Sequence, residues 1–301
     1  MAAELRIGTS GYSFRDWAGT VYPRNAKPGD YLSHYARWFD VVEINTTYYR
    51  IPEPEMFERM LSKVSSRFGF VVKTPKEMTH ERAGTQASIS PFIRALQPLL
   101  EQGQLESLLA QFPYAFRPDP ASWEHVERLA DALREVAPLY VEFRHVDWDR
   151  EETYDRLTQL GVGLVNVDLP PLRGLPGPTA RMTNGSAYVR LHGRNTRMWW
   201  NHPTSGHRYD YLYRAEELGP WIERIDTLRS KADKLFVFAN NCHLGQSVVN
   251  ALQLADRFEL PKPPMPPGQM AALLEPSRAE VIETLRSNIS VARRHDPSDE
   301  G

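Results

Sequence analysis

The chain has 301 residues, enough for one large α/β domain or two smaller ones, and 41% of them are hydrophobic, which suffices for a core. Its formal net charge of −2 gives no overall basic field to hold polyanions non-specifically, and its single cysteine, Cys242, excludes an internal disulfide framework. We find no signal-peptide pattern and no apolar segment long enough to span a membrane, so we expect a cytoplasmic protein.

Eight short segments rich in β-branched and aromatic residues predict strands. In chain order they are Leu5–Thr9, the run that begins at Val41, Phe68–Lys73, the second half of Leu105–Phe112, Leu139–Arg144, Gly163–Asp168, Ala187–His192 and Leu235–Asn240.

Helical spacing of apolar residues and capping signals predict helices between most of these strands. They are Asp30–Phe39, about Glu53 to Ser66, a helix that begins at Ser90-Pro91 with Ser90 as its cap, a helix capped by Ser122 that runs to Val136, Glu151–Leu160, about Ala215 to Lys231, and Gln246–Arg257.

Eight strands that alternate with helices predict a (β/α)8 TIM-type barrel over residues 1–258. The segment Leu169–Ser186 contains too much Pro and Gly for a helix, so the barrel is expected to be irregular between strands six and seven. A doubly wound open sheet is the alternative, but no G-x-G-x-x-G turn follows a strand, and we expect no nucleotide cofactor. Residues 259–301 predict a Pro-rich linker, Leu260–Gln269, and a short helix with a capping box at Ser277 and Glu280.

Several dispersed motifs also resemble one known family. The segments GTSGYSFRDWAGTVYP, VVEINTTYYRIP, FGFVVKTPKEMTH, LLAQFP, VEFRHVDW, YVRLHGR and FANNCHLGQSVVNALQL resemble, in this order, the successive signatures of the YecE-like family, a domain of unknown function numbered seventy-two. The resemblance covers about Leu5 to Leu254, while the Pro-rich tail lies outside the family pattern. It implies a TIM-type barrel, in agreement with the strand count, and it implies no activity.

Polar side chains stand at nearly every strand end, where barrel enzymes place their functional groups. Glu43, Glu142 and Arg190 are each flanked by apolar residues within a strand, so emergence of the strand into water does not explain them. Two carboxylates that face each other across a barrel mouth can divide the roles of general acid and general base. We therefore predict four catalytic residues, which are Glu43, Glu142, Asp168 and His192.

Two other interpretations of the same residues stay open. Glu142, Arg144 and Glu43 could form a buried ion network that only stabilises the barrel. Imidazole and carboxylate groups could also bind Zn²⁺ or Mn²⁺, with Glu43, Glu142, Asp168 and His192 as candidate ligands. No H-x-H or H-E-x-x-H spacing occurs, so a divalent metal is a candidate cofactor without a motif to support it.

Cations and aromatic residues near the strand ends predict an anionic substrate that carries a ring. Lys73, Arg144 and Arg190 would hold the anion. The loop Arg194–Arg208 is basic and aromatic and predicts a lid or a substrate-gripping loop. The remaining predicted substrate contacts are amides and aromatic rings, namely Asn45, Gln111, Asn240, Asn241, Tyr48, Trp199 and Tyr209.

We therefore expect an enzyme that applies carboxylate acid–base chemistry to an anionic, ring-bearing substrate, and we favour cleavage of a phosphodiester or a phosphosugar, nucleic acid included. One alternative is a metal-free lyase or isomerase of a small sugar phosphate. Another is a nucleic-acid- or metabolite-binding protein without turnover. The expected partner is an anionic small molecule or a nucleic-acid fragment, and no membrane.

Overall fold

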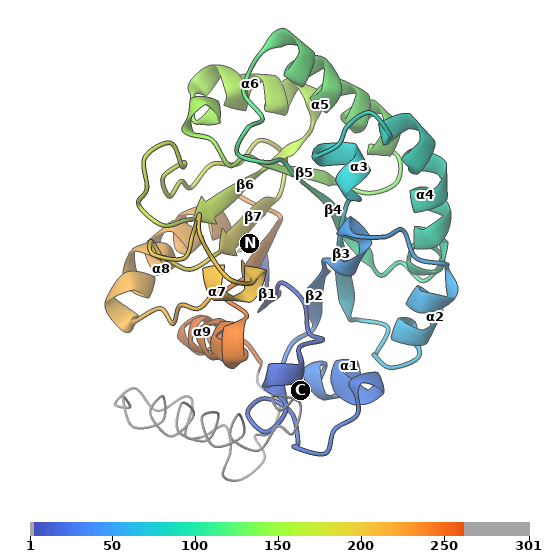
Figure 1. The fold of residues 1–301 in the computed structure, drawn as a ribbon, viewed down its shortest axis with the longest axis vertical. Coiled ribbons are helices and arrows are strands. Elements are labelled where there is room, and N and C mark those ends of the chain that lie inside the picture. The colour runs from blue at the N-terminus through green and yellow to red at the C-terminus, as the bar shows by residue number, and fades with distance from the viewer. Residues whose placement is uncertain (1–2, 262–301) are drawn as a thin grey trace.

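The structure, a computed structural model, describes residues 3–261, and within this range eight parallel strands form one sheet that curls into a barrel (Figure 1). The strand order is β1-β8-β7-β6-β5-β4-β3-β2, so each strand lies beside its neighbour in sequence and β8 returns to β1. The predicted (β/α)8 barrel is confirmed. The strands are β1 Glu4–Thr9, β2 Val41–Ile44, β3 Gly69–Lys73, β4 Leu105–Gln111, β5 Leu139–Glu142, β6 Gly163–Asp168, β7 Ala187–Leu191 and β8 Lys234–Ala239.

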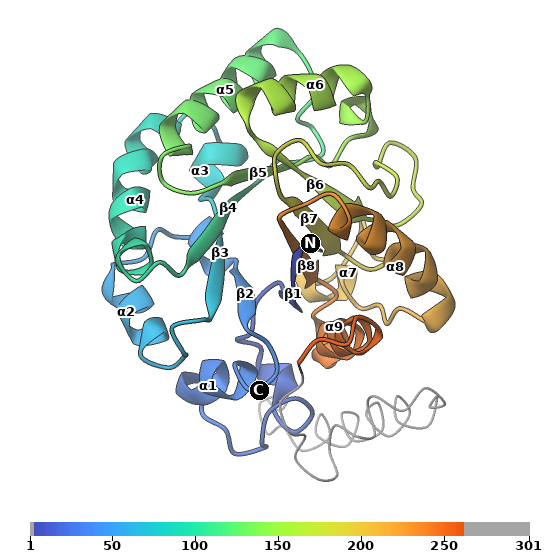
Figure 2. The ribbon, with the colours of Figure 1, turned by 180° about the vertical axis from the view of Figure 1, so that it is seen from behind.

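The helices form an outer layer around the strands, as the view from behind also shows (Figure 2). They are α1 Tyr31–Tyr35, α2 Glu55–Leu61, α3 Lys76–Thr79, α4 Thr85–Glu101, α5 Pro120–Leu133, α6 Glu151–Leu160, α7 Ser205–Arg208, α8 Ala215–Arg229 and α9 Gln246–Arg257. As predicted, the segment 169–186 between β6 and β7 contains no helix. Across residues 3–261 no helix is both long and apolar enough to cross a membrane. The predicted C-terminal helix and most of the linker lie outside the described residues.

Two predicted helix starts are wrong. Helix α4 begins at Thr85, so Ser90 and Pro91 lie inside it. A proline inside a helix removes one backbone hydrogen bond, but the apolar face of α4, which includes Phe92, Leu96 and Leu99, is buried. Burial of that face stabilises the helix from Thr85 onward and outweighs the start signal at Ser90-Pro91, because packing provides most of a helix's stability in a folded protein.

Helix α5 shows the second misplaced start. Its N-cap is Asp119, whose carboxylate accepts a hydrogen bond from the backbone N–H of Ser122 at 2.7 Å, and Pro120 occupies the first helical position. Ser122 therefore lies within the first turn and does not cap it, because the Asp-Pro pair supplies the cap and the fixed φ three residues earlier.

The barrel interior consists of an apolar layer below a polar layer. Alternate residues of each strand point inward, and the apolar layer includes Val41, Val71, Leu109, Tyr140, Tyr188 and Phe236. Two residues further along, the inward positions of β2, β3, β4, β5 and β7 hold polar groups, whereas β8 continues with Phe238 before Asn240 follows it. The other face of each strand packs against the helices in a second, larger apolar cluster. The apolar layer thus closes the barrel from below and supports the polar layer near the carboxyl ends of the strands.

A tyrosine from α1 joins the two strands that no hydrogen-bonded ladder connects. The hydroxyl of Tyr35 accepts from the backbone N–H of Thr9 on β1 at 2.9 Å and donates to the carbonyl of Val41 on β2 at 3.0 Å. A Cβ atom at Gly8 would lie 2.4 Å from the same carbonyl, so glycine permits the close approach of β1 and β2. Tyr35 therefore completes the barrel at this seam.

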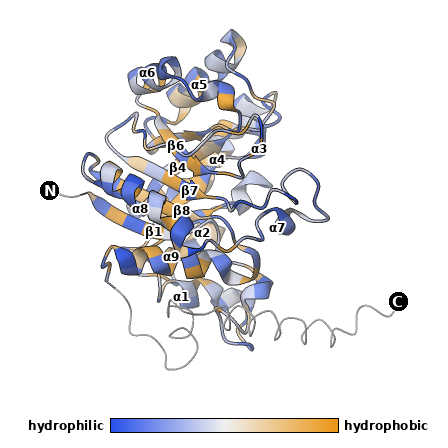
Figure 3. Cartoon of the chain, turned by 90° about the vertical axis from the view of Figure 1, so that its left-hand side faces the viewer, coloured by the Kyte–Doolittle hydropathy of each residue, from blue (hydrophilic) through white to orange (hydrophobic). Residues whose placement is uncertain are grey.

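The two ends of the barrel differ. Figure 3 shows the start of β1 toward one end and α7 toward the other. Helix α7 belongs to the long connection between β7 and β8, and it lies at the end where the strands finish. The functional residues predicted from the sequence are at this end.

Candidate functional site

Six polar side chains form the layer above the apolar interior, each from the end of a different strand. Glu43 lies near the end of β2, Arg190 near the end of β7, and Asn240 directly after β8. The other three are the last residues of their strands, namely Lys73 on β3, Gln111 on β4 and Glu142 on β5. The two-residue periodicity of strands brings all six inward together, which the sequence pattern predicts.

Arg190 joins the two predicted catalytic carboxylates. Its guanidinium donates to Glu43 Oε1 at 2.6 Å and to Glu142 Oε2 at 2.6 Å, and all three side chains are buried. Arg144 donates to the other oxygen of Glu142. The buried ion network considered from the sequence therefore exists, but Arg190 from β7, rather than Arg144, connects Glu43 to Glu142.

Neutral donors occupy the remaining positions around both carboxylates. Glu43 also accepts from Asn45 Nδ2 at 2.8 Å and from the hydroxyl of Tyr188 at 2.5 Å. Glu142 Oε1 lies 3.2 Å from His192 Nε2. Burial alone would raise the pKa of Glu142, but Arg144 and Arg190 outweigh it and hold this pKa well below its usual range. Glu142 is thus a permanently ionised partner of two arginines, and it is poorly suited to deliver a proton near neutral pH.

His192 is held neutral by the same surroundings. Asn240 Nδ2 donates to His192 Nδ1 at 2.7 Å, which assigns the imidazole proton to Nε2, facing Glu142. Burial, followed by the nearby Arg144, lowers the pKa of His192 to about 3. We infer that His192 and Asn240 fix the position of Glu142 in the network.

A cavity of about 810 Å³ opens above this polar layer. Eight of the predicted site residues line it, which are Glu43, Asn45, Tyr48, Lys73, Gln111, Arg190, Tyr209 and Asn240. The other six predicted residues lie outside its lining, which are Glu142, Arg144, Asp168, His192, Trp199 and Asn241. Eight of the predicted residues can therefore contact a ligand in the cavity, and the other six can act only through their neighbours.

Lys73 differs from the other buried cations because no carboxylate pairs with it. Its Nζ donates to Gln111 Oε1 at 2.8 Å and lies 4.4 Å from the centre of the Tyr48 ring. Among residues 3–261 we find no Asp or Glu oxygen at ion-pair distance from this amine. Burial, followed by repulsion from Arg190, lowers the pKa of Lys73 to about 7, against the attraction of Glu142 and Glu43. A large fraction of Lys73 is therefore a neutral amine at neutral pH.

Asp168 and Trp199 attach the loop Arg194–Arg208 to the end of the barrel. Asp168 Oδ1 and Oδ2 accept from Arg194 Nε at 3.1 and 3.0 Å. Trp199 is buried, and the guanidinium carbons of Arg144 and Arg208 lie 5.7 and 5.2 Å from its ring centre. The predicted lid loop thus packs on the barrel through Trp199. Arg208 and Tyr209, beside its end, line the cavity.

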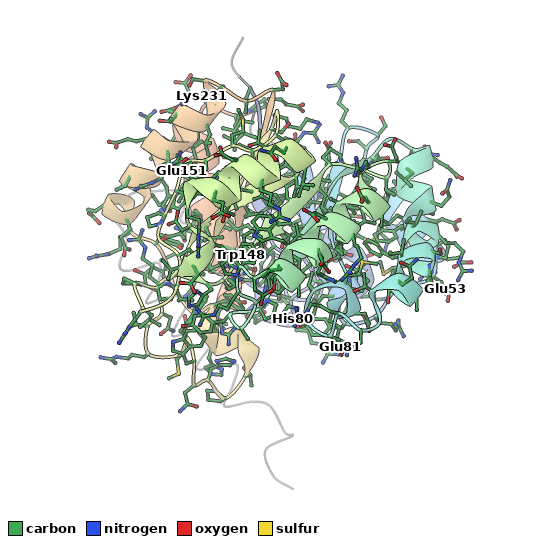
Figure 4. All side chains as sticks on the ribbon, turned by 90° about the horizontal axis from the view of Figure 1, so that it is seen from above. Glu53, His80, Glu81, Trp148, Glu151 and Lys231 are labelled. Atoms are coloured by element: carbon green, nitrogen blue, oxygen red, sulfur yellow. The ribbon has the colours of Figure 1, made fainter. Side chains whose placement is uncertain are left out.

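Sequence reasoning left out several residues that line the cavity or complete it. Tyr188, which donates to Glu43, lies two residues before Arg190 on the same inward face, so strand periodicity could have identified it. Arg59 and Lys63 share one helical face at a spacing of four residues and reach the cavity from α2 and the turn after it. His80, which follows β3, also lines the cavity, and Figure 4 shows it well away from Lys231, toward the other end of the barrel.

The candidate metal ligands do not converge. In the described part of the chain, no three His, Cys, Asp or Glu side chains are arranged to hold a metal ion. Arg190 separates Glu43 from Glu142, and Asp168 is engaged by Arg194. The fourth predicted ligand, His192, lies 3.4 Å from Arg144 Nη2, so all four already contact a guanidinium, which a bound cation would have to displace. The residues present therefore do not fit the divalent metal considered from the sequence.

Comparisons with known proteins agree with the resemblance seen in the motifs. The chain is similar to the UPF0759 protein YunF of Bacillus subtilis, with 25% identity over 283 residues that cover 88% of this chain and 99% of that protein. It is 31% identical to the UPF0759 protein YecE of Escherichia coli K12 over 150 residues, 47% of this chain and 53% of that one.

A solved structure shares the fold. The crystal structure of a DUF72 family protein (TM1631) from Thermotoga maritima is 40% identical, covers 85% of this chain and 99% of its own, and superimposes with a TM-score of 0.79. Residues 6–271 match the family described as "Protein of unknown function DUF72", a match that extends into the Pro-rich segment expected to lie outside it. The chain therefore belongs to the DUF72 family.

Proposed function

We propose that this protein is a metal-independent enzyme that acts on a small, anionic, sugar-like substrate, most simply a lyase or isomerase of a sugar phosphate. The observation that carries the proposal is the charge of the cavity wall. In a chain with a formal net charge of −2, the described residues of the lining include Asp16 and Glu43 as carboxylates and, besides Lys73, five cations, which are Arg50, Arg59, Lys63, Arg190 and Arg208. An excess of cations in a concave site raises the local concentration of anions.

The size and the remaining lining support a small ligand. A volume of about 810 Å³ lies within the range of small-molecule sites. The wall also contains apolar side chains, among them Leu32, Ile44 and Met60, and the ring of Tyr48. An apolar wall beside convergent polar groups suits a ring that carries hydroxyl and phosphate substituents, because the ring faces pack while the substituents accept hydrogen bonds.

Lys73 is better placed than the carboxylates to transfer a proton. Both oxygens of Glu43 and both of Glu142 already accept charged or buried hydrogen bonds. Lys73 lines the cavity, and its pKa of about 7 is near the value at which a general base is most effective. A neutral amine at this position could remove a proton next to a substrate carbonyl. Phosphodiester cleavage by the carboxylates stays a prediction.

The proposal is tested by turnover of a panel of aldose and ketose phosphates, followed by NMR in buffer with and without a chelator. We expect conversion of at least one compound that the chelator does not slow and that Lys73→Met abolishes. Lys231→Met, at the far end of the barrel, is the matched control and should behave as wild type.

Three results would contradict this function: activity that requires added metal, activity that survives in Lys73→Met, or saturable binding of the panel without conversion. The last result would favour a binding protein without turnover, which is the other alternative considered from the sequence. We place the proposed activity in the cytoplasm, since Cys242 is a single, buried cysteine and offers no disulfide framework.

A further inference from the structure

Few of the basic residues of this chain are lysines, yet one of them, Lys73, is buried inside the barrel. Seven of its 36 Lys and Arg residues are lysines. Arg144 and Arg190, the other buried cations of this layer, form ion pairs with carboxylates, whereas Lys73 does not. Arginine binds an anion through bidentate hydrogen bonds and keeps its proton, whereas a buried lysine can lose its proton and become a nucleophile. The choice of lysine at this position therefore indicates covalent or proton-transfer chemistry rather than charge pairing.

The contacts of Lys73 fix its amine at the floor of the cavity. Gln111, the last residue of the neighbouring strand β4, accepts one hydrogen bond from Nζ, and the Tyr48 ring lies against the amine. The hydroxyl of Thr47 donates to the backbone carbonyl of Lys73 at 2.5 Å, which holds the end of β3. When the amine is neutral, one N–H is held by Gln111 and the lone pair is left without a partner among the described residues. The amine is thus held by its neighbours and accessible from the cavity.

We propose that Lys73 forms an imine with a carbonyl carbon of the substrate in this cavity. The inference rests on the proposed function and makes it more specific, because it restricts the substrate to an aldehyde or ketone. The lone pair of Nζ attacks the carbonyl carbon, a C–N bond forms, and the carbonyl π electrons move to oxygen. The amine then gives up both protons to that oxygen, which leaves as water, and a C=N bond remains. Protonation of the imine makes an electron sink for proton removal or C–C cleavage next to that carbon.

The charged groups around Lys73 suit both states of this cycle. Arg190 and Arg144 favour the neutral amine that attacks, and Glu142 and Glu43 favour the cation that the protonated imine carries. His80, which also lines the cavity, has a pKa lowered to about 4 by burial and by Lys73, so it stays neutral and adds no charge near neutral pH. The opposing contributions keep the amine near its midpoint, where both states are accessible.

Pyridoxal 5′-phosphate is a suitable probe, because it is an aldehyde that carries a ring and a phosphate. The full chain would be incubated at about pH 7.5 with a limiting amount of this compound, reduced with sodium borohydride, digested and mapped by mass spectrometry. We expect the reduced pyridoxyl group on Lys73, at a rate on the order of tenfold above that of any exposed lysine, since an ordinary lysine is almost entirely protonated at this pH. The labelling of Lys73 should reach half its maximum near pH 7.

Lys231→Met is the matched control and should label at Lys73 as wild type does, while Lys73→Met should lose the fast label. Labelling of exposed lysines only, or labelling of Lys73 that begins only at the pH of an ordinary lysine, would overturn the inference. If Lys73→Met does not fold, the peptide map and the pH profile of the wild-type chain decide the question alone.

The imine and the proposed function can fail separately. If a sugar phosphate is converted without metal and borohydride added during turnover neither traps it nor stops the reaction, the imine is refuted and the metal-free enzyme stands. If Lys73 labels rapidly but no sugar phosphate is converted, the reactive amine is supported and the proposed function fails.

Discussion

Replacement of Lys73 by methionine should change how the stability of this protein depends on pH. Methionine matches the apolar stem of lysine but carries no amine, so the variant removes the titrating group and keeps most of the packing. Lys73 is about 9% exposed, and solvent screening of its amine is therefore small. The perturbation isolates the free energy that burial of an unpaired amine costs.

The sign and size follow from the two pKa values. The pKa of Lys73 is about 7 in the folded chain and takes the ordinary value of 10.5 when the chain is unfolded. Between these values the unfolded chain holds a proton that the folded chain lacks, so the free energy of unfolding rises with pH. The rise is at most about 1.4 kcal/mol per pH unit, or about 2–3 kcal/mol from pH 7 to pH 9. Below pH 7 both states are protonated, and the full cost of the buried charge is present.

Urea unfolding followed by circular dichroism at about pH 6, 7.5 and 9 measures this difference. We expect Lys73→Met to be more stable than wild type at pH 6 by a few kcal/mol, and the advantage should shrink toward pH 9. Groups that titrate in both proteins cancel in the comparison. Lys231→Met should track the wild type throughout. A constant difference between Lys73→Met and wild type over this range would show that Lys73 keeps its proton, which would refute both the neutral amine and the chemistry built on it.

Three further substitutions test the network and the seam. Arg190→Met should lower the free energy of unfolding by roughly 3–5 kcal/mol, because Glu43 and Glu142 lose a shared buried partner; a loss below about 1 kcal/mol in urea unfolding would contradict this role. Glu142→Gln should be destabilised at neutral pH, because Arg144 loses its carboxylate partner and Arg190 keeps only Glu43. Since the pKa of Glu142 lies well below 4.5 in the folded chain, the deficit of the variant relative to wild type should shrink as pH falls below 4.5. Tyr35→Phe leaves two buried backbone groups without a partner and should cost about 1–3 kcal/mol by thermal unfolding, with faster amide exchange at the end of β1; exchange as slow as in wild type would show that the seam closes without the hydroxyl.

The sequence alone determined the barrel and most of its polar layer. Alternation in VVEIN places Val41 and Glu43 on one face, and the same periodicity in LYVE and AYVRL places Glu142 and Arg190 inward. These are local properties of strands, which is why seven strands and the helix Glu151–Leu160 are found close to where the pattern predicts. The strand β4 begins at Leu105 and is longer than the predicted second half of Leu105–Phe112. The start of α4 was missed because burial of its apolar face outweighs the capping signal at Ser90.

Only the tertiary structure decided which charges pair. Arg190 contacts Glu43 across 147 residues of sequence and Glu142 across 48, and no local pattern specifies either distance. The curvature of the barrel brings β2, β5 and β7 around one point, so Arg190 pairs with both carboxylates while Arg144 pairs with Glu142 as well. The two residues predicted as an acid–base pair therefore belong to a buried ion network. Lys73 lies in the same layer outside that network. Burial without a carboxylate partner lowers the pKa of the Lys73 amine. The absence of this ion pair depends on how the strands are placed around the barrel, so it could not be predicted from the sequence.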